Sequence, residues 1–297
     1  FLILKNYYHY FHHFLEWFES NLHLKLLLFL MMLGYALLSL SPITNADSLD
    51  YHIGVALHIL NTGNMPATPE WFHSRVSGNG EVLNAIGFAA GAEQFGSLLQ
   101  FVSLVSILGL IYHAGSNPSE RANRIKEFDD RWRLLLTIAA ASPPVLVALI
   151  GSVKPQLLPA AMTSLALALC LFPSRRELDK SRSLKGFGLV CLLVMTASQA
   201  KFSFLLGGGV VGLIAFFLMV KRQLLLLAVV VSTVSFLLIM MPPAIWKSVN
   251  FNSGLLESLL TPFPGNWAGT DRFESFLRSY RDTDLLFPFS LIIPSSL

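Results

Sequence analysis

Long apolar stretches alternate with short charged clusters along this chain of 297 residues, and that alternation restricts its fold more than any other feature. Hydrophobic residues make up 54% of the sequence and charged residues only 13%. A soluble domain carries about 25% charged residues. A chain with so few charges, collected between apolar segments, is typical of a protein that crosses a bilayer several times. Because lipid offers the backbone no hydrogen-bond partner, we predict an all-α fold, a polytopic bundle of transmembrane helices.

Seven apolar segments are candidates for transmembrane helices, and a truncated eighth begins at residue 285. Several are shorter than the ~20 residues that a membrane-crossing helix needs, so their ends are approximate. The two pairs that flank Lys154 and Lys201 are joined by very short turns, and each pair could instead be one long, broken element. Pro143-Pro144 and Pro242-Pro243 are expected at kinks or at span ends. The seven segments are residues 22–40, 95–112, 134–151, 157–172, 187–200, 203–220 and 224–242.

The distribution of lysine and arginine predicts how the chain is oriented in the membrane. These residues gather in segments 113–133 and 173–186 and at Lys221-Arg222, and alternate segments carry fewer of them. The positive-inside rule therefore places the N-terminus and the basic turns in the cytoplasm, and residues 41–94 and 243–284 outside. Because the chain starts without a methionine and stops within an apolar run, we interpret residues 1–297 as a single transmembrane domain, the N-terminal part of a longer protein.

The first external segment contains the most informative motif of the chain. Pro42 ends the first apolar segment, Asn45 or Asp47 can cap a new helix, and Gly63 is well placed to end it. An apolar stripe at helical spacing lies between these signals and predicts an amphipathic helix in the outer membrane interface. The stripe consists of Leu49, Ile53, Ala56, Leu57 and Leu60.

Two carboxylates lie on the first turn of this expected helix, Asp47 and Asp50, next to Tyr51 and His52. A structural interpretation is that Asp47 caps the helix and Asp50 interacts with the positive end of the helix dipole. A functional interpretation is that Asp47 is a catalytic base, because an unpaired charge at the edge of lipid is costly. Both interpretations stay open, and one residue could serve both roles.

The pattern Asp-x-Leu-x-Tyr-His after a proline-terminated first span resembles the bacterial membrane glycosyltransferases of the GT-C superfamily, in particular their hypothetical-membrane-protein branch. The resemblance implies that an acidic residue of the first external loop activates the acceptor and that the sugar donor is a polyprenyl-phosphate sugar. By motif position, Asp47 would be the catalytic residue, with Asp50 as a second candidate. Tyr51 and His52 would bind substrate.

Further segments of the chain resemble elements of the same superfamily. Glu81, in Gly-Asn-Gly-Glu-Val-Leu, matches a glutamate that opens a second external helix. Lys154 lies in Lys-Pro-Gln, where relatives often have Lys-Pro-Asp, and Lys201 follows a helix of small residues. Segment 250–265 is similar to an element near the donor site, but it lacks the Gly-Asn-Pro core.

Three basic residues of the predicted external face have two interpretations each. Lys154 and Lys201 would either extend their ammonium groups to the lipid headgroups or bind the phosphate of the donor. Arg272 would either bind substrate or pair with neighbouring carboxylates such as Asp271 and Glu274.

Other classes of site find little support in the sequence. The histidines of the first 23 residues are interleaved with aromatic residues, which favours an interfacial helix over a metal site. Cys170 and Cys191 lie in apolar segments and are expected to be small core residues. The triplet Gly207-Gly208-Gly209 is expected to permit close helix packing or a bend. We predict no cofactor, and a divalent metal is not indicated. No patch for nucleic acid is evident.

The sequence thus predicts a glycosyltransferase of the cytoplasmic (inner) membrane with its active site on the external, periplasmic side. Its partners would be a lipid-linked sugar donor, membrane lipids, and a glycan, lipid or protein acceptor. Two alternatives stay open: a transporter or flippase, and a non-catalytic subunit of a glycan assembly system. A transporter would concentrate polar residues and internal symmetry at the middle of the membrane, whereas this chain places its polar groups in the expected external segments.

Overall fold

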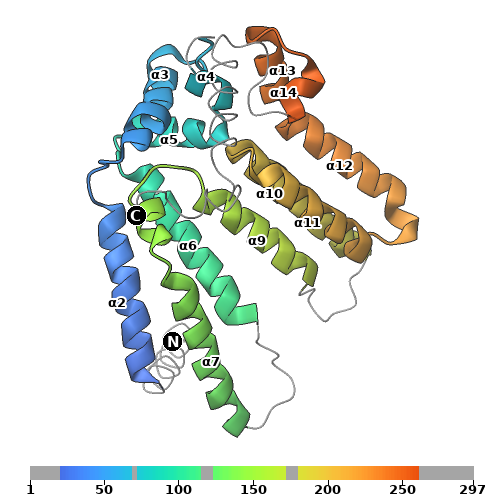
Figure 1. Cartoon of the computed structure of the whole chain (residues 1–297). Helices are drawn as coiled ribbons and strands as arrows, with labels where there is room; N and C mark the ends of the chain where they lie inside the picture. The colour runs from blue at the N-terminus through green and yellow to red at the C-terminus, as the bar shows by residue number, and fades with distance from the viewer. Residues whose placement is uncertain (1–20, 69–71, 115–122, 172–179, 261–297) are drawn as a thin grey trace, which may run out of the picture. The chain divides into compact units, whose positions relative to one another are not determined.

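The computed structural model describes residues 21–68, 72–114, 123–171 and 180–260, and in these ranges all regular structure is helical (Figure 1). Within these ranges, four helical segments are long and apolar enough to cross a membrane: Leu22–Ser39 (α2), Phe95–Ala114 (α6), Ser183–Ala200 within α10 (Lys180–Ala200), and Arg222–Ile239. The last combines the short 3₁₀ helix η2 (Arg222–Leu224) with α12 (Leu225–Ile239). The all-α fold is therefore confirmed and the four candidate spans support a membrane protein, whereas a count of seven or eight spans is not confirmed.

The remaining predicted spans are shorter or divided. Helices α9 (Leu157–Leu171) and α11 (Phe204–Met219) are apolar but have fewer than 18 residues. The segment predicted as one span at 134–151 is two helices, α7 (Asn123–Ala141) and α8 (Val145–Ile150). Pro143 and Pro144 separate them, because a proline cannot donate the helical hydrogen bond and its ring clashes with the preceding turn. The expected eighth span, from residue 285, lies outside the described residues.

The chain divides into two units, each with its own internal contacts. Unit 1 consists of residues 1–65 and 77–240 and contains all the apolar helices named above, together with η1 (Ser48–Ile53), α3 (Gly54–Thr62) and α5 (Asn79–Ala89). In unit 1, α6 packs against α2, α7 and α9, and α10 packs against α9, α11 and α12.

Unit 2 consists of residues 66–76 and 241–297, and its described helices are α4 (Phe72–Val76), α13 (Met241–Asn250) and α14 (Leu255–Leu260). The guanidinium carbon of Arg75 lies 4.8 Å from the centre of the Phe251 ring, and both side chains are buried. This cation–π contact joins the two parts of unit 2. Arg75 lies in the predicted external segment 41–94, and Phe251 lies in the predicted external segment 243–284.

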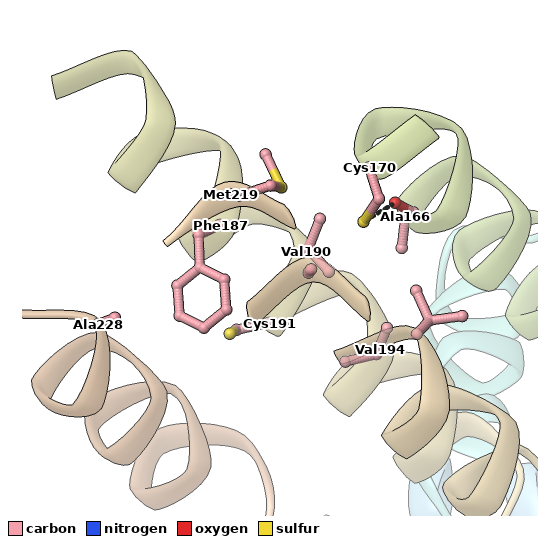
Figure 2. Close-up of a cluster of buried hydrophobic side chains, with 10 residues drawn as sticks. Ala166, Cys170, Phe187, Val190, Cys191, Val194, Met219 and Ala228 are labelled. Atoms are coloured by element: carbon pink, nitrogen blue, oxygen red, sulfur yellow. Dashed lines mark hydrogen bonds between the residues drawn. The ribbon is translucent and has the colours of Figure 1, made fainter. Parts of the chain in front are cut away.

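Small residues permit close helix packing in the core of unit 1. Figure 2 shows Cys170 of α9 and Cys191 of α10 among Val190, Val194 and Phe187. Both cysteines are buried and free, which confirms them as small core residues. A Cβ atom on Gly208 would lie 3.2 Å from the backbone oxygen of Val194, so this glycine does permit the close approach of α11 to α10.

A second core in unit 1 joins α2, α6, α7 and α8. The hydroxyl of Tyr35 in α2 donates a 2.7 Å hydrogen bond to the backbone oxygen of Ala141, the last residue of α7. The final carbonyls of a helix have no partner within the helix, and this tyrosine satisfies one of them inside an apolar environment. The bond fixes the end of α7 just before the proline pair.

Candidate functional site

The helix predicted in the first external segment is present, and its cap is Asn45. The side-chain oxygen of Asn45 accepts a 3.1 Å hydrogen bond from the backbone N–H of Ser48. Asp47 occupies the position before η1 but its side chain forms no capping hydrogen bond. The interpretation of Asp47 as a helix cap is therefore wrong. Gly63 ends α3 with φ of 71°, the left-handed conformation that glycine adopts without steric cost.

The first part of this helix, η1, is a π-helix, and α3 continues it. Short π-helical segments are rare and occur frequently at functional sites, because the extra residue per turn redirects side chains. The buried face of η1 and of the start of α3 is formed by Ser48, His52, Val55 and Ala56. The expected apolar stripe is only partly correct, since Leu49, Leu57 and Leu60 are exposed. Leucines exposed beside transmembrane helices are suited to contact with lipid.

The buried face of η1 meets α5 through a pair of polar side chains. Nδ1 of His52 lies 2.7 Å from Oε1 of Glu81, and the Glu81 residue is 1% exposed. The other carboxylate oxygen, Oε2, accepts a 2.8 Å hydrogen bond from the backbone N–H of Gly78. With a carboxylate as its acceptor, Nδ1 of His52 carries the proton. Glu81 thus caps its own helix and fixes the ring of His52.

Two glycines allow the start of α5 to approach the neighbouring turns. A Cβ atom on Gly78 would overlap the backbone oxygen of Gln199, near the end of α10. A Cβ atom on Gly80 would lie 2.5 Å from the ring of Pro155, in the turn between α8 and α9. Such close approaches exclude any larger residue without a backbone shift. The first turn of α5 therefore lies against both turns that carry the predicted lysines.

The turn that contains Lys154 is held by two buried side chains. The amide nitrogen of Asn84, in α5, donates a 3.2 Å hydrogen bond to the backbone oxygen of Val153. The side-chain oxygen of Gln100, in α6, accepts a 2.7 Å hydrogen bond from the backbone N–H of Leu157. Both bonds satisfy backbone groups where water is excluded, so they fix the conformation of the turn.

This turn brings Lys154 to Asp47. Nζ of Lys154 lies 2.5 Å from Oδ2 of Asp47, and the two side chains are 24% and 49% exposed. A partly solvated ion pair of this kind stabilises a fold by about 0–1 kcal/mol. The pair is therefore weak enough to exchange for another partner, unlike the buried contact between His52 and Glu81.

Lys201 lies close to the same charges, in the turn between α10 and α11. Its pKa is lowered, first by burial and then by the charge of Lys154, while Glu81 and Asp47 act in the opposite direction. In the described part of the chain, no carboxylate lies within ion-pair distance of its ammonium group. A half-buried ammonium in this situation would be stabilised by an added anion.

Tyr51 completes this group of side chains. Its ring stacks on His52 with ring centres 4.1 Å apart. The pKa of its phenol is raised by burial and further by Glu81 and Asp47, so it stays protonated and can donate a hydrogen bond at any physiological pH.

We call these six residues the polar cluster, and all of them belong to unit 1: Asp47, Tyr51, His52, Glu81, Lys154 and Lys201. Each was a site residue predicted from the sequence. Asp50, also predicted, is exposed on η1 and is not among the charges that shift the pKa of Lys201 or Tyr51. Arg272 lies outside the described residues.

The sequence did not identify Asn84 and Gln100, which hold the turn that contains Lys154, because in the sequence they are isolated polar residues in apolar helices. Their spacing gave no signal, because their partners lie more than 50 positions away in the chain. The glycines were visible in the quoted motif Gly-Asn-Gly-Glu, but their contacts with Pro155 and Gln199 were not.

An apolar groove of about 330 Å³ lies between α10, α11 and α12. It is lined along α10 from Phe187 to Ser198, roughly 16 Å of helix at about 1.5 Å per residue. Ser198 and Leu205, at one end of the groove, lie within a few residues of Lys201 on either side. In the described ranges, no group of three histidine, cysteine or acidic residues could hold a metal ion.

Comparison with known proteins identifies the family but no characterised relative. The family model of the DUF1420 N-terminal domain matches residues 1–297, and the chain therefore belongs to this family. No curated protein and no solved structure matches the chain.

Replacing Glu81 with alanine tests the buried contact that joins η1 to α5. The substitution leaves Nδ1 of His52 and the N–H of Gly78 without their acceptor, so we expect the free energy of unfolding to fall by about 2–4 kcal/mol. Thermal unfolding in detergent micelles measures the change. Glu93→Ala is the control, since Glu93 is an exposed carboxylate in the same segment and its loss should have little effect. Equal melting temperatures for both variants would show that the contact does not stabilise the fold.

The pKa of Lys201 predicts a pH dependence of stability. The unfolded chain keeps the Lys201 proton up to its ordinary pKa of 10.5, and the folded protein releases it at lower pH. The unfavourable contribution of this group is therefore present below the folded pKa and is relieved as the pH rises towards 10.5. We expect Lys201→Met to raise the melting temperature at pH 7 and to flatten its rise with pH. Lys185→Met, an exposed position on α10, is the control. A lower melting temperature for Lys201→Met would show that Lys201 has a partner that compensates its charge.

Proposed function

We propose that this DUF1420 N-terminal domain is part of a GT-C-type glycosyltransferase that moves a sugar from a polyprenyl-phosphate donor to an acceptor. The observation that carries the proposal is the contact between Asp47 and Lys154, with Lys201 close enough that the charges of both groups act on the pKa of Lys201. An accessible carboxylate near two ammonium groups provides a base for the acceptor hydroxyl and counter-charges for a departing phosphate. The resemblance of the Asp47–His52 motif to GT-C enzymes supports the same assignment.

Asp47 would act as the base. Its carboxylate accepts the proton of the acceptor hydroxyl as that oxygen forms a bond to the anomeric carbon of the sugar. The bond between the anomeric carbon and the phosphate oxygen breaks, and its electron pair leaves on the polyprenyl phosphate. At 49% exposure, the side chain of Asp47 is accessible to an acceptor that arrives from water.

Lys154 and Lys201 would stabilise the departing phosphate. Negative charge increases on the phosphate as its bond to the sugar breaks, and ammonium groups fixed near that position lower the barrier. His52 would accept a hydrogen bond from a hydroxyl of the substrate through Nε2, because its proton lies on Nδ1, which faces Glu81. Tyr51, protonated and stacked on His52, would donate a hydrogen bond to substrate.

The apolar groove would hold part of the polyprenyl chain. A chain lying from Phe187 towards Ser198 would bring its phosphate to the end of the groove near Lys201. The groove and the polar cluster would then bind the two chemically different halves of one lipid-linked donor.

In this proposal the protein lies in the cytoplasmic membrane of a bacterium with its N-terminus inside. The two shorter apolar helices and the pair α7–α8, counted as one span, complete a bundle of seven spans with the four longer helices, and the segment from residue 285 would be the eighth. The polar cluster then faces the periplasm, on the side where the positive-inside rule places residues 41–94.

The test is genetic complementation with the full-length gene. Surface glycans of a deletion strain are compared after expression of wild-type protein, Asp47→Asn or Glu93→Gln at matched membrane levels. Loss of the base should reduce transfer at least about 100-fold, so Asp47→Asn should fail to restore a glycan that the wild type and Glu93→Gln restore. Full restoration by Asp47→Asn would exclude this residue as the base. Movement of a lipid-linked sugar across proteoliposomes without a covalent product would instead favour the transporter alternative.

A further inference from the structure

The ion pair between Asp47 and Lys154 conflicts with the proposed role of Asp47 as a base. A carboxylate that holds an ammonium group at 2.5 Å is a poorer proton acceptor than a carboxylate without that partner, because proton uptake would break the pair. The resting arrangement therefore suppresses the activity that the proposed function assigns to Asp47. Asp47 can act as a base only after it separates from Lys154.

The two carboxylates of the polar cluster differ in how easily they can change partner. Glu81 is 1% exposed and both of its oxygens are engaged, by His52 and by the N–H of Gly78. Breaking those contacts would leave buried polar groups without partners, at about 1–3 kcal/mol for each. Asp47 is half exposed, and separating it from Lys154 costs about 0–1 kcal/mol. Only the Asp47 contact is cheap enough to exchange during a reaction cycle.

The two lysines also differ, and the difference indicates which ligand would drive the exchange. Lys154 has Asp47 as its partner, whereas no carboxylate of the described chain pairs with the ammonium of Lys201. The charges of the two lysines oppose each other. A phosphate placed between them would neutralise this repulsion and give Lys201 an anionic group in direct contact.

We propose that phosphate binding switches the site on: a phosphate group takes Lys154 and Lys201 as its partners, Lys154 leaves Asp47, and the carboxylate, separated from Lys154, becomes the base. This inference rests on the proposed function for the role of Asp47, but the exchange itself concerns binding alone. Without a phosphate ligand, Lys154 keeps the carboxylate occupied, and water is not activated in place of the acceptor.

The exchange predicts an unusual effect of a substitution on binding. Because Asp47 competes with phosphate for Lys154, Asp47→Asn should tighten phosphate binding about 3- to 5-fold, the size expected for an exposed ion pair. Lys154→Gln should weaken it, and adding Asp47→Asn to Lys154→Gln should produce no further tightening. Asp50→Asn removes the same charge three residues away and should change the affinity far less.

The measurement is isothermal titration calorimetry of the purified full-length protein in detergent. The probes are inorganic phosphate and farnesyl monophosphate, which separate a free phosphate from a lipid phosphate as the source of the group. Tightening by Asp47→Asn that disappears in the Lys154→Gln background supports the exchange with either probe. If Asp47→Asn binds phosphate as tightly as the wild type or more weakly, the exchange is wrong. It is also wrong if Asp47→Asn tightens binding in the Lys154→Gln background, because that effect would reflect net charge alone.

Failure of this inference differs from failure of the proposed function. If Asp47→Asn abolishes glycan transfer but does not tighten phosphate binding, Asp47 is the base and the exchange is wrong. If phosphate binding follows the predicted pattern but surface glycans do not depend on Asp47, the exchange exists in a protein with another activity. Absence of phosphate binding to the wild-type protein with both probes would also overturn the inference.

Discussion

The buried carboxylate of Glu81 joins the parts of the polar cluster that are distant in the chain. A carboxylate that is 1% exposed is costly unless its oxygens are hydrogen-bonded, and here His52 and the backbone of Gly78 supply those bonds. The bond to His52 fixes η1 against α5, and the glycines at the start of α5 let it lie against the turns of Lys154 and Lys201. The position of Asp47 relative to the lysines follows from this arrangement.

Other buried polar groups of unit 1 also need hydrogen-bond partners. Inside an apolar bundle every backbone group at a helix end needs a partner, and Tyr35, Asn84 and Gln100 each provide one. These side chains are rigidly placed because leaving them unsatisfied would be expensive. Asp47 and Lys154 are different, since both reach water and their contact is weak. The site therefore combines a fixed frame with one ion pair that can exchange.

The sequence predicted well those features that depend on local pattern. Six of the seven complete apolar segments are present as helices, and so are the helix that ends at Gly63 and the helix opened by Glu81. Local pattern was less informative where contacts between distant parts of the chain determine the partner of a side chain. Asn45 and Asp47 were both candidates for the cap; Asn45 takes that role, and Asp47 pairs with Lys154, more than 100 positions away. The single span expected at 134–151 is divided because two adjacent prolines interrupt the helix rather than bend it. The roles of the clustered residues in catalysis are still predictions.

The central claim is that Asp47 and Lys154 meet in the folded protein, and zero-length cross-linking in native membranes tests it most directly. A carbodiimide activates a carboxylate, and an amine within contact distance then forms an amide bond with it. We expect mass spectrometry to find a peptide in which Asp47 is joined to Lys154, as their 2.5 Å separation requires. If Asp47 instead reacts with an added small amine and no link to Lys154 forms, the two residues are apart and the account of the site is wrong.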